Sequence, residues 1–159
     1  MLARVCHNIQ YLDLTFFMKT KITYGILWWI IIFVEVSILG FIPFFATMEN
    51  NQIMFNTKGY IIHFIFIALL ALGLARTYYK NNRSGWRQGV ALALVITAVS
   101  FLLDAIVTVP LFVKDYGMFY SSWSLWLSVA ISCAMFIIGS EFFKQKAQID
   151  AVVDETLEL

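Results

Sequence analysis

The chain has 159 residues, the length of one small domain, but 61% of them are apolar and only 13% are charged. Soluble domains have about 45–50% apolar and about 25% charged residues, and a domain this small cannot bury the excess. The composition therefore excludes an ordinary water-soluble globule and predicts a chain that faces the lipid bilayer, while the net charge of +1 gives no reason to expect a nucleic-acid partner.

Residues 1–23 precede the first long apolar stretch and allow two interpretations. Apolar residues such as Val5, Ile9 and Leu12 recur at helical spacing, which is typical of a short helix in the membrane interface. Alternatively, the Met-Lys-Thr-Lys segment that starts at Met18 is typical of a natural N-terminus, and residues 1–17 are then an extension from an upstream start. A cleaved signal peptide is not expected, because the apolar run begins too late and continues too far.

Four apolar stretches follow, each near the length of about 20 residues that a helix needs to cross the hydrocarbon core. We expect the spans at residues 24–46, 59–79, 88–112 and 119–143. None shows the alternation of a strand, and a helix satisfies its backbone polar groups within the segment. The sequence therefore predicts an all-α fold, an integral membrane four-helix bundle over residues 24–143.

The C-terminal tail, residues 144–159, has apolar residues every four positions, at Ile149, Val153 and Leu157. This spacing predicts a cytoplasmic helical extension of the last span. The tail is either a binding segment for a partner protein or a solvated helix end that frays.

Lysine and arginine predict the orientation of the bundle. Nine of the eleven basic residues flank the spans on the side of the termini and two lie on the other side. Cytoplasmic loops carry such an excess, so we expect cytoplasmic N and C termini in a multi-pass protein of the cell membrane, and the short loops favour a prokaryotic inner membrane. The nine are Arg4, Lys19, Lys21, Arg76, Lys80, Arg83, Arg87, Lys144 and Lys146, and the two are Lys58 and Lys114.

Ionisable residues within the spans are the candidate functional residues, because a charge in hydrocarbon is costly. Counted from the outer ends of the expected spans, His63 lies about 6 Å deep, Asp104 about 12 Å and Glu35 about 16 Å. All three fall between the outer surface and the midplane. Such a graded series suits an outward-opening proton path or cation site.

Asp104 belongs to a polar stripe on the third span with Thr97, Ser100 and Thr108, all within an arc of about 80° around a helix. The stripe predicts an ion or proton site with hydroxyl neighbours, or alternatively hydrogen bonds that join helices. Glu35 has only apolar helical neighbours, so desolvation favours its protonated form. Glu35 is expected either to exchange a proton with a cationic substrate or to stay neutral and form a hydrogen bond to a serine or a backbone carbonyl. His63 either belongs to the same site or contacts lipid headgroups.

Small residues form a face on the fourth span and another on the second, and both predict close helix packing, within the chain or in a homo-oligomer. The first comprises Ser124, Ser128, Ser132 and Gly139, and the second Ala68, Ala71 and Ala75. We expect no cofactor and no disulfide, because Cys6 is cytoplasmic and Cys133 lies mid-span. No nucleophile–base pair is visible, so an intramembrane enzyme acting on lipid is the least favoured class.

Two local resemblances add to these expectations. Phe33-Val-Glu35-Val36-Ser is similar to the first helix of small multidrug resistance transporters, which implies a proton- and cation-exchanging role for Glu35. The basic start at Met18 and the segment Leu103–Phe112 resemble small uncharacterised prokaryotic four-span membrane proteins, which implies the same four-helix fold and no particular activity.

The sequence thus predicts a non-enzymatic polytopic membrane protein that binds or transports a small cation or proton. Its candidate site comprises Glu35, His63, Ser100, Asp104 and Thr108. The alternative is an accessory or scaffold protein that binds a membrane protein partner through its helices and its C-terminal tail.

Overall fold

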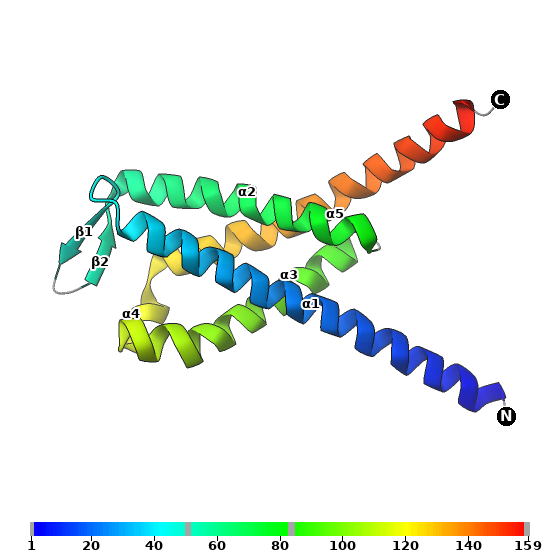
Figure 1. Ribbon diagram of the computed structural model, residues 1–159, viewed down its shortest axis with the longest axis horizontal. Helices are drawn as coiled ribbons and strands as arrows, with labels where there is room; N and C mark the ends of the chain where they lie inside the picture. The colour runs from blue at the N-terminus through cyan, green and yellow to red at the C-terminus, as the bar shows by residue number, and fades with distance from the viewer. Residues whose placement is uncertain (1, 50–51, 83–84, 158–159) are drawn as a thin grey trace.

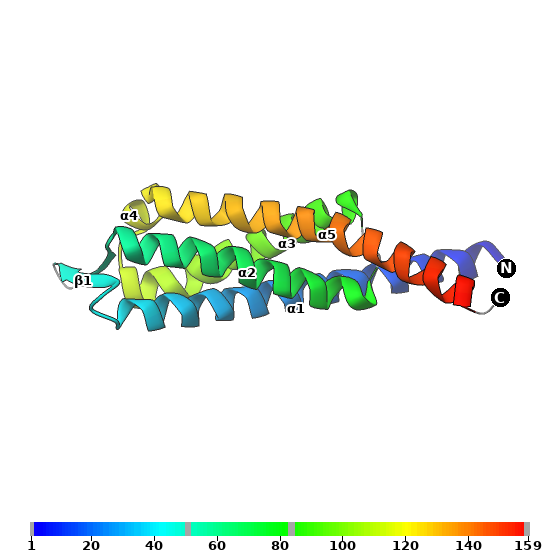
Figure 2. The same ribbon diagram turned by 90° about the horizontal axis from the view of Figure 1, so that it is seen from above.

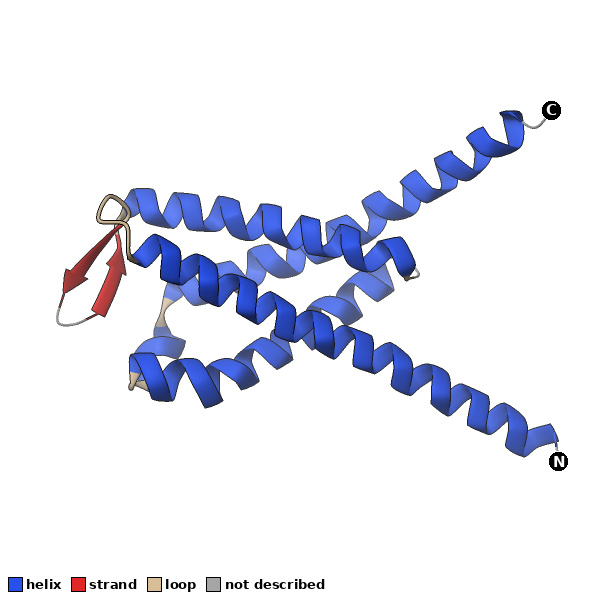
Figure 3. Ribbon diagram, in the orientation of Figure 1, coloured by secondary structure: helices blue, strands red, loops and turns tan. Residues whose placement is uncertain are grey.

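A computed structural model of the chain describes residues 2–49, 52–82 and 85–157. Figure 3 shows that helices make up almost all of it, with one pair of strands. In chain order the elements are α1 (Leu2–Gly40), β1 (Ala46–Glu49), β2 (Gln52–Phe55), α2 (Thr57–Asn81), α3 (Trp86–Leu103), the π-helical segment η1 (Asp104–Val113), α4 (Tyr116–Ser121) and α5 (Trp123–Leu157).

Four helical segments are long and apolar enough to cross a membrane, namely Met18–Gly40, Thr57–Lys80, Trp86–Val113 and Trp123–Phe143. The all-α fold with four candidate spans is confirmed, and the protein is a polytopic membrane protein. Large apolar side chains such as Leu69, Leu94 and Phe142 lie exposed on the outside of the bundle. These exposed side chains account for the high apolar content of the chain, and they lie on the surface that faces lipid.

The helices run lengthwise, with both termini at one end of the molecule and the β1–β2 hairpin and α4 at the other (Figures 1 and 2). We call these the terminal end and the hairpin end. Helix α5 packs against both α2 and α3, and α1 packs mainly against α3. The first part of α1 and the last part of α5 extend past the other helices and diverge (Figure 1).

Small residues let the helices approach closely within one chain. A Cβ built on Gly139 of α5 would lie 2.9 Å from the Cβ of Ala75 on α2, closer than side chains normally pack. Ala71 and Ala75 are fully buried. The small-residue faces of the second and fourth spans therefore pack against each other inside this bundle.

The first span ends earlier than the sequence predicts. Helix α1 stops at Gly40 rather than at residue 46, and Ala46 already begins β1, which pairs antiparallel with β2. Pro43 explains the difference, because proline has no N–H to donate and disfavours helical backbone at the residue before it. The hairpin was not predicted, because half of residues 46–55 are polar and such a segment is equally suited to an irregular connection between two spans.

The start of α1 also differs from the expected layout of residues 1–23. The helix runs from Leu2 into the span without a break, so these residues do not form a separate interfacial helix. No glycine or proline occurs before Gly25, and nothing in the local sequence therefore ends a helix there.

The third and fourth spans also differ in their boundaries from those that the apolar pattern of the sequence predicts. The expected span at 88–112 changes from α-helix to π-helix at Asp104, with Pro110 inside the π-helical part. Lys114 closes this segment, donating its N–H to the Val109 carbonyl at 2.7 Å. The fourth span begins at Trp123 rather than at residue 119, because Ser122 is extended and separates α5 from the short helix α4.

Candidate functional site

An ion pair joins α1 and α2 near the hairpin end. Nδ1 of His63 lies 2.8 Å from Oε2 and 3.0 Å from Oε1 of Glu35. Glu35 is 9% exposed and His63 6% exposed. The pairing replaces two expectations, because Glu35 is not isolated among apolar residues and His63 does not point out toward headgroups.

The two residues meet because their helices end at similar levels. Glu35 lies five residues before Gly40, the end of α1, and His63 lies six residues after Thr57, the start of α2. At about 1.5 Å per residue these are depths of about 8 Å and about 9 Å. The expected depth of about 16 Å for Glu35 was wrong because the span ends at Gly40.

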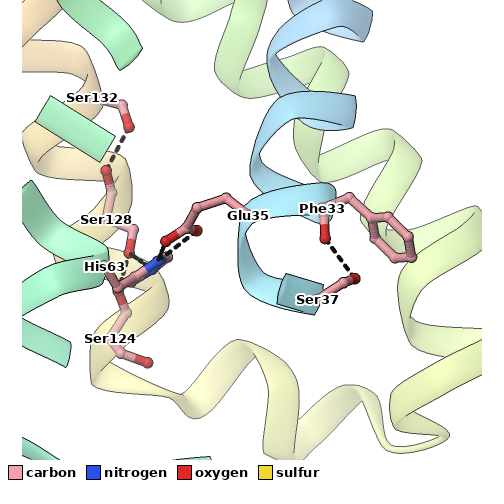
Figure 4. A network of polar contacts seen from close by, with 7 residues as sticks. All are labelled: Phe33, Glu35, Ser37, His63, Ser124, Ser128 and Ser132. Atoms are coloured by element: carbon pink, nitrogen blue, oxygen red, sulfur yellow. Dashed lines mark hydrogen bonds and ion pairs between the residues drawn. The ribbon is translucent and has the colours of Figure 1, made fainter. Parts of the chain in front are cut away.

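The other ring nitrogen of His63 faces a serine of α5. Nε2 lies 3.2 Å from Oγ of Ser128, and this hydroxyl donates to the carbonyl of Ser124 at 2.7 Å. Figure 4 shows Glu35, His63 and Ser128 turned toward one another from three helices. A carbonyl can only accept, so the single hydroxyl hydrogen of Ser128 is used there and Nε2 of His63 is the donor to Ser128.

Only some charge states of the pair satisfy the contacts of both ring nitrogens. With a hydrogen on Nε2, Nδ1 either accepts from a protonated Glu35 or donates to an ionised Glu35 as part of an imidazolium. The pair holds one shared proton in both cases, and its net charge is zero. Glu35 and His63 can therefore exchange a proton between them without changing the charge of the bundle.

Two hydrogen bonds reach the carboxyl group of Asp104, and both go to the same oxygen. Its Oδ1 accepts from Nε1 of Trp29 at 2.9 Å and from Oγ1 of Thr108 at 2.7 Å. Among the described residues, Oδ2 accepts no hydrogen bond and no basic side chain forms an ion pair with this carboxyl. Burial raises the pKa of the nearby Tyr120 hydroxyl in α4, and the negative charge of Asp104 raises it further.

A cavity of about 370 Å³ brings these groups together inside the bundle. Its hairpin-end wall includes Tyr60 and Phe119, and its deepest wall includes Trp28 and Ile96. Glu35 does not line the cavity but is bonded to His63, which does. The polar side chains that line it are His63, Thr97, Ser100, Asp104, Thr108, Ser122, Ser124, Ser128 and Ser132.

Ser100, in the wall of the cavity, has a hydroxyl without a hydrogen-bond partner among the described residues. Oγ of Ser100 is buried and makes no hydrogen bond with the described residues. Ser100 precedes Asp104 by one helical turn, so both belong to the same face. A buried hydroxyl without a partner is unusual in a native fold, but this oxygen is enclosed by the protein and is not presented to the cavity.

The structure places four of the five predicted site residues, all except Glu35, in the wall of one cavity. Ser128 was considered only as a packing residue, and its contact with His63 was missed. Serines at positions 124, 128 and 132 fall on one helix face, and this pattern was the only available signal. Lys21, one of the nine basic residues on the side of the termini, is 2% exposed.

No protein-family model matches the chain, and neither does any curated protein or solved structure.

Proposed function

We propose that the protein binds and transports a small cation or proton at Asp104. The observation that carries this proposal is the charge of the cavity. The Glu35–His63 pair has no net charge, and Asp104 is paired with no basic side chain of the described chain. An ionised Asp104 therefore leaves the cavity with one uncompensated negative charge, which a monovalent cation or a proton neutralises.

A carboxylate within a membrane span costs several kcal/mol unless it is compensated. Trp29 and Thr108 both donate hydrogen bonds to Oδ1, and hydrogen bonds to a charged group are stronger than those between neutral groups. They leave Oδ2 open to the cavity. This arrangement favours reversible binding of a cation over a permanent structural role.

The Glu35–His63 pair supplies a second proton site in contact with the same cavity. Addition of a proton gives the pair a positive charge close to the bound cation, and like charges repel. A proton arriving at this pair would therefore weaken cation binding at Asp104. The pair is suited to couple proton movement to cation release.

We infer that the cavity opens to the outside and that both termini are cytoplasmic. The support is the sequence distribution of lysine and arginine, with nine residues on the side of the termini and two on the hairpin side, which follows the positive-inside rule. A prokaryotic inner membrane is the proposed location, since the connections between the spans are short.

We also infer a non-enzymatic role, although Glu35, His63 and Ser128 are arranged like an acid–base–nucleophile triad. Ser128 lies inside α5, where its backbone N–H belongs to the helix ladder. Acyl transfer needs free donors for the oxyanion, and the helical backbone around Ser128 supplies none. The chain of contacts is better suited to holding a proton than to attacking a carbonyl.

The test is cation and proton flux into proteoliposomes that contain the purified protein. We expect flux in the wild type, loss of flux in Asp104→Asn, and loss of proton coupling in Glu35→Gln. Asp115→Asn and Glu141→Gln are the matched controls, because neither side chain lines the cavity. Absence of flux under every gradient, or wild-type flux in Asp104→Asn, would contradict the proposal.

A second candidate, an accessory protein that binds a membrane partner through its tail, has one observation in its favour. Helix α5 continues to Leu157, well past the span that ends at Phe143, and its end projects from the bundle (Figure 1). This candidate predicts that deletion of residues 145–159 removes a co-purifying protein while Asp104→Asn retains it. The transport proposal predicts instead that Asp104→Asn abolishes flux, whereas deletion of residues 145–159 leaves flux unchanged.

A further inference from the structure

We infer that the cation bound at Asp104 is an organic ammonium ion with an apolar body and at least one N–H group. This inference rests on the proposed function and names its substrate class. It is carried by three features of the cavity, which are its aromatic walls, its single carboxylate, and the oxygen of that carboxylate that accepts no hydrogen bond.

Aromatic rings from four helices line the cavity around Asp104. They belong to Trp28, Trp29 and Phe33 of α1, Tyr60 of α2, Phe101 of α3 and Phe119 of α4. Aromatic faces attract cations, and ammonium groups are often recognised by several rings together. Apolar walls also favour an apolar ligand body, which a metal ion lacks.

The cavity is poorly equipped for a metal ion. Calcium takes six to eight oxygen ligands and magnesium needs an octahedral set, whereas Asp104 is the one carboxylate in this wall. Across the described parts of the chain, no group of three or more His, Cys, Asp or Glu side chains could hold a metal. The volume of about 370 Å³ also lies within the range of about 300–1,000 Å³ for small-molecule pockets.

One carboxylate oxygen in the cavity wall can receive an N–H group. Oδ2 of Asp104 makes no hydrogen bond with the described residues, because Trp29 and Thr108 both donate to Oδ1. A protonated amine can donate to Oδ2. A quaternary ammonium ion can satisfy the charge but donates no hydrogen bond.

The test is calorimetric titration of the purified full-length protein with four probes at neutral pH. They are benzylammonium, benzyltrimethylammonium, benzyl alcohol as the neutral counterpart of similar size, and sodium or potassium chloride. We expect benzylammonium to bind at least about tenfold more tightly than benzyl alcohol, because only the former pairs with the carboxylate. Benzyltrimethylammonium should bind more weakly than benzylammonium, and the inorganic salts should give no binding heat.

Three variants assign the binding to this cavity. Asp104→Asn should weaken benzylammonium binding by about tenfold or more, and Phe101→Leu by about threefold through loss of one ring. Phe66→Leu is the matched control, because Phe66 is 46% exposed on the outside of α2. A fold check by thermal unfolding accompanies each variant, so that loss of binding is compared only among folded proteins.

The outcomes separate this inference from the proposed function. If the inorganic cations bind and lose binding in Asp104→Asn while benzylammonium does not bind, the cation site stands and the organic ligand class is overturned. Equal binding of benzyl alcohol and benzylammonium also overturns the inference, since charge then plays no part. If no cation binds at all, the organic ligand class is overturned and the cation arm of the proposed function fails with it, and the flux measurement then decides whether Asp104 carries a proton.

Discussion

Nδ1 of His63 lies 2.8 Å from Oε2 of Glu35, and this contact links α1 to α2 at a level where both helices are within the bilayer. Nε2 of the same ring extends the link to Ser128 of α5. Three helices therefore meet at one imidazole. The contact makes a specific stability prediction, independent of any ligand.

Removal of one partner from the pair should destabilise the bundle. Glu35→Ala or His63→Ala leaves a buried ionisable group without its partner, which costs about 3 kcal/mol in buried pairs. The double variant should cost less than the sum of the two single variants, because neither unpaired group then remains. Thermal unfolding in detergent measures the cycle, and strictly additive losses would show that the two residues do not interact.

The approach of α2 and α5 at Gly139 predicts a steric effect. Gly139→Ala places a methyl group 2.9 Å from the Cβ of Ala75, and overpacking of this kind costs about 1–3 kcal/mol. Gly73→Ala is the matched control, since its new Cβ meets nothing within 4 Å and alanine favours the helix by about 0.5–1 kcal/mol. Opposite shifts in unfolding temperature are expected, and a stabilised Gly139→Ala would contradict the packing described.

The hydrogen bonds donated to Asp104 should raise the affinity of the site for a cation. Thr108→Val keeps the shape of the side chain but removes a hydrogen bond to the carboxylate, and such bonds to charged groups are worth about 1.5–3 kcal/mol. We expect cation affinity to fall by roughly tenfold, because the charged form of Asp104 loses support. Thr77→Val serves for comparison, since Thr77 donates only to the Gly73 carbonyl on an exposed face. Equal affinities in both variants would argue against a binding role for Asp104.

Ser128 provides a check on the non-enzymatic assignment. A fluorophosphonate probe phosphonylates activated serines, and we expect no modification of Ser128 in the folded protein by intact-mass analysis. Labelling that disappears in Ser128→Ala and in His63→Ala but persists in Ser132→Ala would show an activated nucleophile. That result would replace the cation site with a hydrolytic one.

The proposed orientation is measurable by cysteine labelling in intact cells. In a variant without Cys6 and Cys133, Lys114→Cys at the hairpin end should react with an impermeant maleimide, whereas Arg87→Cys should react only after the cells are opened. The reverse pattern would invert the bundle and place the cavity on the cytoplasmic side.

The sequence was sufficient for the four spans because each contains a continuous apolar run of membrane-spanning length. It was insufficient at their ends. Residues between Gly40 and Ala46 are as apolar as the span before them, so hydropathy extended a helix that Pro43 prevents. The error of six residues in that boundary also misplaced Glu35 in depth and concealed its pairing with His63.

The candidate site was predictable as a set of residue types but not as an arrangement. Asp104, Ser100 and Thr108 lie on one helix, and their common face follows from helical spacing alone. The pairing of Glu35 with His63 and Ser128 depends on the rotations of three helices, which spacing within one helix does not determine. Ser128 carried no separate signal, since serines at four-residue intervals are equally typical of helix packing.

The most direct test of a cation at Asp104 is carbodiimide modification in membranes. Dicyclohexylcarbodiimide reacts with carboxyl groups in apolar surroundings, and the modified residue is identified by peptide mass analysis. We expect that Asp104 is modified and that benzylammonium slows its modification in proportion to occupancy, while benzyl alcohol has little effect. A modification rate at Asp104 that no cation changes would contradict the account.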